Sequence, residues 1–179
     1  MKLLFITPPM GNWAPWGDRH LAVNSLHAQV AAFIREKNAA DVSVLDCRAQ
    51  GLNDDQMIDE VQRQRPDAVF FGAMIAAAGG AATLNRFHAA MQKIKDIAPQ
   101  TVTIGGGLMY TAVPQKIMTD NPQLDFAIVG VFADNEYAVF ELLEELKKPA
   151  PNFTGINGLA YRKNGDVVLT PARPVIANL

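Results

Sequence analysis

Three adjacent glycines, Gly105, Gly106 and Gly107, are the residues of this sequence whose type and spacing point most directly to ligand binding. They follow the short apolar segment Val102 to Ile104, which is typical of a buried strand. Consecutive glycines cost conformational entropy, and they are favoured where another group approaches the backbone closely. We therefore expect them to contact a ligand; a flexible strand-to-helix turn is the alternative.

Four further apolar segments end in prolines or small residues in the same way. Their ends are Thr7-Pro8-Pro9, Asp46-Cys47, Gly72-Ala73-Met74 and Val129-Gly130-Val131. In an open parallel sheet, ligands bind in the crevice at the carboxyl ends of the strands. The sequence therefore predicts a wide edge with little charge, which suits a large, flat cofactor approached mainly by backbone groups.

The other common ligands of such sheets require motifs that this sequence lacks. A dinucleotide site needs G-x-G-x-x-G after the first strand. Here the glycines follow the fourth predicted strand, and Tyr110 stands where the third motif glycine would be. A P-loop would end in Gly-Lys-Ser/Thr, which is absent. The acidic residues of a phosphoacceptor domain and the Ser- and Thr-rich loop of a flavin-phosphate site are also missing from the first strand end.

The elements that must position this edge are strands that alternate with helices. Apolar residues at helical spacing predict a first helix from about His20 to Lys37. Asn53 and Gln56 form a capping-box pattern that opens the second helix, and Pro114 suits the first turn of a short later one. Five such units predict an α/β fold, with a flavodoxin-like or Rossmann-like five-stranded parallel sheet and helices on both faces.

The pattern changes after Lys148. Pro149-Ala150-Pro151 reads as a linker, and the strand-like segments 159–161 and 167–169 flank Asn164-Gly165, a strong signal for a two-residue hairpin turn. We expect an α/β domain over residues 1–148, followed by a linker and a C-terminal β-hairpin extension over residues 149–179. The last residues have no evident partner in the sequence, which favours a domain cut from a longer protein.

Composition narrows the class of protein. The chain has 179 residues of which 49% are hydrophobic, enough for one sizeable core. A net charge of −2 and a pI near 5.9 predict neither nucleic acid nor an anionic membrane as a partner. No apolar run approaches the roughly 18 residues that span a bilayer. Cys47 is the only cysteine, which excludes an intrachain disulfide and a self-contained iron–sulfur cluster. We expect a cytoplasmic protein.

Several of these segments together resemble a known family. They are Pro8-Pro9, Pro66-Asp67-Ala68-Val69, Ile104 to Gly107, Ile128-Val129-Gly130 and the tail that begins at Gly155. Their order is similar to that of the N-terminal cobalamin-binding domain of cobalamin-dependent radical S-adenosylmethionine enzymes. The resemblance implies cobalamin at the carboxyl edge, its corrin across the loops after strands one and three and its nucleotide tail near the glycines. It implies cofactor contacts at Ala73, Met74, Ile75, Ala76, Gly105, Gly106, Gly107, Tyr110, Val129, Gly130 and Phe132.

Gly17-Asp18-Arg19-His20 resembles the opening of the D-x-H-x-x-G motif of other cobalamin domains. In that motif the histidine ligates cobalt and the aspartate holds its second ring nitrogen. Asp18 and His20 are therefore candidate cofactor-binding residues, although Val23 replaces the motif's last glycine. The interpretation that we favour makes Asp18 the cap of the first helix, places His20 in its exposed first turn, and assigns no metal ligand.

Two departures from the family bear on function. The Gly-Glu-Gly-Glu stretch that often follows strand five is replaced by residues 132–136, where only Glu136 keeps its place. The C-x-x-x-C-x-x-C motif that would bind a [4Fe-4S] cluster is absent. We therefore expect a cobalamin module whose partner is a C-terminal radical barrel of the same protein, which would carry S-adenosylmethionine and the cluster for methyl transfer or cyclisation. The alternatives are a stand-alone enzyme, such as a nucleotide-sugar transferase or a hydrolase, and a non-catalytic interaction module.

Overall fold

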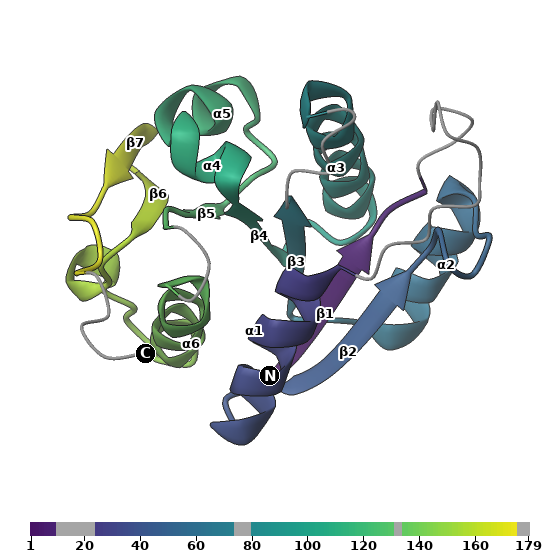
Figure 1. Ribbon diagram of the computed structural model, residues 1–179, viewed down its shortest axis with the longest axis horizontal. Helices are drawn as coiled ribbons and strands as arrows, with labels where there is room; N and C mark the ends of the chain where they lie inside the picture. Colours follow the sequence, from purple (N-terminus) through teal and green to yellow (C-terminus); the bar gives the residue numbers. More distant parts are fainter. Residues whose placement is uncertain (10–23, 74–79, 131–133, 175–179) are drawn as a thin grey trace.

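The computed structural model of this chain describes residues 1–9, 24–73, 80–130 and 134–174. The described residues form a seven-stranded sheet in the order β2-β1-β3-β4-β5-β6-β7 (Figure 1). The first five strands are parallel, and they are β1 (Lys2–Thr7), β2 (Asp41–Asp46), β3 (Ala68–Ala73), β4 (Val102–Gly107) and β5 (Phe126–Ile128). The order 2-1-3-4-5 is the flavodoxin-like order, so the predicted fold class is confirmed.

Helices cover both faces of the sheet (Figure 1). One face carries α1 (Ser25–Glu36) and α6 (Asp134–Leu146), and the other carries α2 (Asp54–Gln64), α3 (Gly80–Ile97), α4 (Leu108–Ala112) and α5 (Pro114–Asp120). Alternate residues of β1 serve the two faces: Leu3 and Phe5 pack with α1 and α6, whereas Leu4 and Ile6 pack with α2 and α3. Burial on both faces explains why Leu3 to Ile6 of β1 form a continuous apolar run.

Local signals place several helix ends correctly. The capping box is present, because the Gln56 amide donates to Asn53 Oδ1 and the Asn53 amide donates to Gln56 Oε1, each over 2.9 Å. Pro114 is the first residue of α5.

The predicted start of the first helix is wrong. α1 begins at Ser25, and Asn24 caps it in an extended conformation, with its Oδ1 accepting the His27 amide over 3.3 Å. Asp18 is therefore not the cap of α1, and His20 is not in its first turn. Apolar spacing gives the face of a helix but leaves its first residue to be decided by whichever side chain reaches the free amides.

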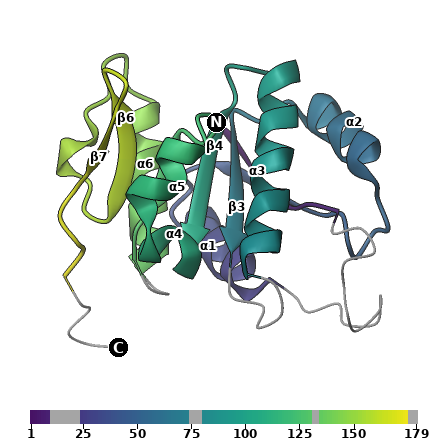
Figure 2. The ribbon, with the colours of Figure 1, turned by 90° about the horizontal axis from the view of Figure 1, so that it is seen from above.

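The C-terminal hairpin belongs to the main sheet. Its strands are β6 (Leu159–Lys163) and β7 (Asp166–Leu169), joined through Asn164 and Gly165 at φ 54° and 92°, as the sequence predicted. β6 pairs antiparallel with β5, so the hairpin extends the sheet beside α5 (Figure 2). A short 3-10 helix, η2 (Phe153–Gly155), precedes it. Arg173 forms an ion pair with Glu141 of α6, which gives the described part of the tail a partner.

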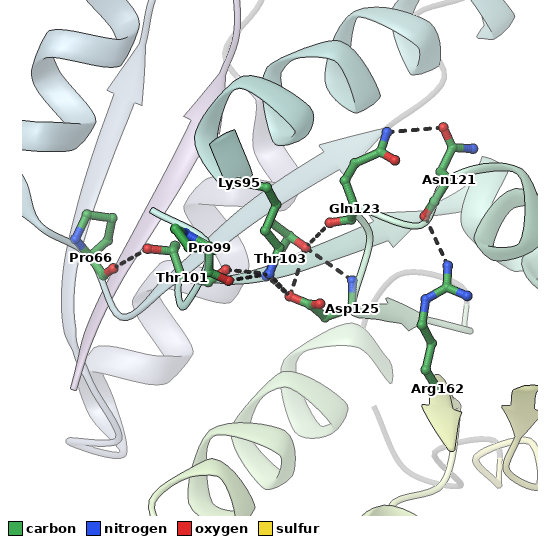
Figure 3. A network of polar contacts seen from close by, with 9 residues as sticks. All are labelled: Pro66, Lys95, Pro99, Thr101, Thr103, Asn121, Gln123, Asp125 and Arg162. Atoms are coloured by element: carbon green, nitrogen blue, oxygen red, sulfur yellow. Dashed lines mark hydrogen bonds and ion pairs between the residues drawn. The ribbon is translucent and has the colours of Figure 1, made fainter. Parts of the chain in front are cut away.

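A polar network ties the amino ends of β4 and β5 to α3 (Figure 3). Lys95 Nζ lies 2.6 Å from Asp125 Oδ2, and the same oxygen accepts the Thr103 amide over 2.8 Å and the Thr103 hydroxyl over 3.1 Å. Arg162 of β6 donates to the Asn121 carbonyl over 3.1 Å, which attaches the hairpin to the end of α5. This network lies at the opposite edge of the sheet from the predicted cofactor site.

Candidate cofactor-binding site

The candidate site lies where β1 and β3 separate at their carboxyl ends. α1 leads from β1 to β2 over one face of the sheet, and α2 returns from β2 to β3 over the other. The ladder between β1 and β3 ends at Phe5 and Phe70, although β1 continues to Thr7 and β3 to Ala73. Diverging connections of this kind open the crevice in which flavodoxin-like sheets bind ligands.

Two side chains from the start of α1 bind the backbone of β3 at this point. The Gly72 amide donates to Nε2 of His27 over 2.8 Å, and Asn24 Nδ2 donates to the Gly72 carbonyl over 3.1 Å. Gly72 itself pairs with Gly106 of β4. Asn24 and His27 therefore take the place that β1 would occupy if the ladder continued, and we call this arrangement the Gly72 clamp.

His27 is buried and electrically neutral. The residue is 2% exposed, and its ring packs against both Phe5 and Phe70, at centroid distances of 5.4 and 5.9 Å. Burial lowers the pKa of His27 to about 3. Because Nε2 accepts the Gly72 amide, the proton of the neutral ring is on Nδ1. A β-carbon at Gly72 would lie 2.8 Å from His27 Cδ2, so this approach requires glycine.

Sequence analysis had no signal for this role of His27. A histidine on a mixed helix face is compatible with a packing position, and the burial agrees with that interpretation. Its partner Gly72, however, is 45 residues away in the chain, and only the tertiary structure brings the two together.

The glycines after Val102 are part of β4, and the first two face the protein's own interior. A β-carbon at Gly105 would lie 2.4 Å from Cε1 of Tyr110, and one at Gly106 would lie 2.6 Å from Cζ of Phe70. Gly107 differs, because it has a φ of 103° and stands at the edge of the sheet before α4. The structure thus gives an internal reason for Gly105 and Gly106, and their contact with a cofactor stays a prediction.

Tyr110 is fully buried beside these glycines. Its hydroxyl lies 3.4 Å from Nε2 of His88, which is also buried. Burial raises the pKa of Tyr110 and lowers the pKa of His88 to about 4, so both side chains are neutral at pH 7. The predicted cofactor contact of Tyr110 stays untested, and in this structure its ring packs in the layer between β4 and α3.

Thr111 joins two of the predicted cofactor residues at the carboxyl edge. Its hydroxyl oxygen lies 3.1 Å from the Gly107 carbonyl and 2.9 Å from the Gly130 carbonyl, and it accepts the Gly130 amide over 3.0 Å. Asn135 of α6 donates to the same Gly130 carbonyl over 3.3 Å. Sequence reasoning missed Thr111 and Asn135, because neither stands in a recognisable motif.

The remaining candidates are placed as follows. Ala73 is the last residue of β3, and Val129 directly follows β5, where its amide donates to the Gly158 carbonyl over 2.8 Å. Glu136 lies in the first turns of α6, where burial raises its carboxyl pKa against a hydrogen bond from Gln29 that lowers it. The candidates that lie outside the described residues are Asp18, His20, Met74, Ile75, Ala76 and Phe132.

The chemistry of this edge fits a large ligand without strong charge. The described ends of β1, β3, β4 and β5 carry hydroxyl, proline and glycine groups, and the Thr7 hydroxyl is buried with no hydrogen-bond partner among the described residues. Within the described ranges, no cluster of three His, Cys, Asp or Glu side chains could hold a metal ion. The groups present at this edge fit a cofactor that is held through backbone and hydroxyl groups.

Two further observations concern the rest of the surface. A hollow of about 830 Å³ lies at the amino edge, lined in part by Met1, Arg65, Asp67 and Lys147, which is remote from the crevice between β1 and β3. No helix among the described residues has the length and apolar character needed to cross a bilayer.

Known proteins provide an independent comparison. Residues 25–140 match the family described as the B12 binding domain. The chain is 25% identical over 190 residues to the anaerobic magnesium-protoporphyrin IX monomethyl ester cyclase of Rubrivivax gelatinosus, covering all of this chain and 31% of the cyclase. It is 29% identical over 152 residues to an uncharacterized methyltransferase of Pyrococcus horikoshii, covering 85% of this chain and 30% of that protein.

Solved structures share the fold. The radical S-adenosylmethionine methyltransferase TsrM from Kitasatospora setae aligns with a TM-score of 0.73 at 16% identity, over 95% of this chain and 30% of TsrM. The cobalamin-dependent radical enzyme OxsB, with aqua-cobalamin bound, aligns with a TM-score of 0.70 at 16% identity, over 97% of this chain and 22% of OxsB. The chain therefore spans about a third or less of each of these proteins.

Proposed function

This chain belongs to the B12 binding domain family, and from this premise we propose that it binds cobalamin at the carboxyl edge of its sheet as the cofactor module of a radical S-adenosylmethionine enzyme. The observation that carries the proposal is the family match over residues 25–140, which begins at the first residue of α1 and ends within α6. The matched region thus includes α1, α2 and β3 but not β1, and the crevice between β1 and β3 is where this fold binds ligands.

The residues that would hold cobalamin are those at the strand ends. Thr7 offers a buried hydroxyl, and Gly72, Gly107 and Gly130 bring backbone close to the edge without side chains. The corrin would lie across the loops after β1 and β3, with the nucleotide tail towards β4 and β5. When bound, the cofactor supplies a cobalt centre that can carry a methyl group or an electron, and the protein orients it and shields it from water.

The reaction itself would belong to the remainder of a longer protein. Relatives named as a cyclase and as a methyltransferase are about three times as long as the segment that this chain matches. Cys47 is the only cysteine of this chain, so the chain cannot by itself supply the thiolates that hold a [4Fe-4S] cluster. We propose that a C-terminal radical barrel carries S-adenosylmethionine and the [4Fe-4S] cluster for methyl transfer or ring formation.

Cobalamin binding can be measured directly. We expect equilibrium dialysis of the chain with hydroxocobalamin to show roughly one-to-one binding, because the sheet has one switch point. Retention of no cobalamin at a concentration of about 100 μM, where even a weak site would be occupied, would overturn the proposal.

A matched pair of substitutions locates the site. Leu108 is 41% exposed directly after Gly107, and Ile97 is 40% exposed at the opposite edge. Leu108→Arg should weaken cobalamin binding about tenfold by placing a long cation over the predicted site, whereas Ile97→Arg should leave it unchanged. Equal effects of the two substitutions would contradict the carboxyl edge as the site.

A further inference from the structure

We propose that Asn24 and His27 are positioning residues for cobalamin, because their clamp on Gly72 fixes the end of β3 that leads into the predicted corrin loop. This inference rests on the proposed function and deepens it. The clamp is made of two hydrogen bonds, from the Gly72 amide to His27 Nε2 and from Asn24 Nδ2 to the Gly72 carbonyl. Neither residue has to touch the cofactor for this role.

The clamp binds the carboxyl end of β3 beyond the point where β1 stops pairing with it. β1 pairs with β3 only as far as Phe70, so the side of Gly72 that faces away from β4 has no strand beside it. Without His27, the buried Gly72 amide would lose its acceptor, and an unpaired buried amide favours conformations in which the strand end opens to water. If only a fraction of the molecules hold the binding-competent conformation, the apparent affinity for the ligand is reduced by that fraction.

Each of the two clamping side chains makes a second contact besides its bond to Gly72. Asn24 uses Oδ1 to cap α1 through the His27 amide and Nδ2 to hold Gly72, so one side chain joins the helix start to the strand end. The His27 ring packs against both Phe5 and Phe70, and its Nδ1 is buried with no hydrogen-bond partner among the described residues. The single bond from Nε2 is therefore the polar contact that the structure gives this ring.

Two histidine substitutions separate the hydrogen bond from the packing. In His27→Gln the side-chain Oε1 can occupy the place of Nε2 and accept the Gly72 amide. In His27→Asn the side-chain Oδ1 lies at the place of Nδ1 and does not reach it. We expect hydrogen exchange of the Gly72 amide, measured by NMR in the cobalamin-free chain, to be slow in the wild type and in H27Q and at least about tenfold faster in H27N.

The affinity for cobalamin is then measured for the same variants. We expect titration with hydroxocobalamin to give similar affinities for the wild type and H27Q and about tenfold weaker binding for H27N. Asn24→Ser is a milder variant, because serine still caps α1 but does not reach the Gly72 carbonyl. It should weaken binding about threefold with unchanged helix content, and it decides the matter if H27N fails to fold.

The outcomes that would overturn the inference are distinct. Wild-type affinity in H27N with a fast Gly72 amide, or in N24S, would show that the clamp does not position the site. Equal losses in H27Q and H27N would assign the effect to ring packing. Absence of cobalamin binding by the wild type would overturn the proposed function, and the exchange rates, which need no cobalamin, would show separately whether the clamp exists.

Discussion

The ring of Tyr110 lies directly against Gly105, so closely that a β-carbon at Gly105 would come within 2.4 Å of Cε1 and 2.5 Å of Cζ. Both residues are buried, and Tyr110 is 0% exposed. The glycine is therefore required by the packing of α4 on β4, before any ligand is considered.

We predict that Gly105→Ala destabilises the fold by about 1–3 kcal/mol, the usual cost of forcing an extra carbon into a packed core. Urea unfolding would measure it. The cost should largely disappear in a Tyr110→Ala background, since the clashing ring is gone, but should persist in Tyr110→Phe, which keeps the ring. An equal cost in all three backgrounds would contradict the assignment of the clash to Tyr110.

We predict that stability declines as the pH falls below about 6.5, because burial lowers the pKa of His27 to about 3 while an unfolded chain titrates near 6.5. Protons then bind the unfolded chain first, so the contribution is complete above about pH 6.5 and is lost progressively towards pH 3. The slope is about 1.4 kcal/mol per pH unit for this one group. Between pH 5 and 6, the unfolding free energy of His27→Gln should change less steeply with pH than that of the wild type, by the contribution of about one bound proton. An unchanged slope would refute the prediction.

We predict that Asp125→Ala destabilises the chain by about 2 kcal/mol, because it leaves the Lys95 cation and the Thr103 amide without their shared acceptor. The Lys95–Asp125 pair is 17% and 31% exposed, whereas the Lys116–Asp120 pair, at a similar distance, is 75% and 52% exposed. Asp120→Ala is therefore the matched control and should leave thermal stability almost unchanged. Equal effects of the two substitutions would mean that burial does not determine how much an ion pair contributes to stability.

We predict that His20→Ala leaves the visible spectrum and the affinity of bound cobalamin unchanged, since Val23 stands where the D-x-H-x-x-G motif requires its last glycine. Absorption spectra of the wild type and the variant, each loaded with hydroxocobalamin, test this. A shift of the cobalt bands with an intact fold would instead show ligation by this imidazole, with Asp18 behind it.

Signals confined to a few neighbouring residues were enough to predict much of this fold from the sequence. The continuous apolar run Leu3 to Ile6 indicated a strand buried on both faces, Asn53 and Gln56 indicated a helix start, and Asn164-Gly165 indicated a hairpin. Each of these rests on local sterics or on a hydrogen bond between residues close in the chain, so the sequence alone contains the cause. The succession of five β–α units along the sequence predicted the parallel sheet with helices on both faces.

The tertiary structure decided what depends on residues far apart in the chain. It placed the start of α1 at Ser25 rather than near His20, joined β6 to β5, and set Tyr110 against Gly105. It also brought His27 to Gly72, because β1 and β3 diverge beyond Phe70 and a helix side chain fills the gap. A glycine in the sequence indicates that another group approaches the backbone closely, but it does not identify that group. Only packing shows that for Gly72 the group is a buried imidazole and for Gly105 a tyrosine ring.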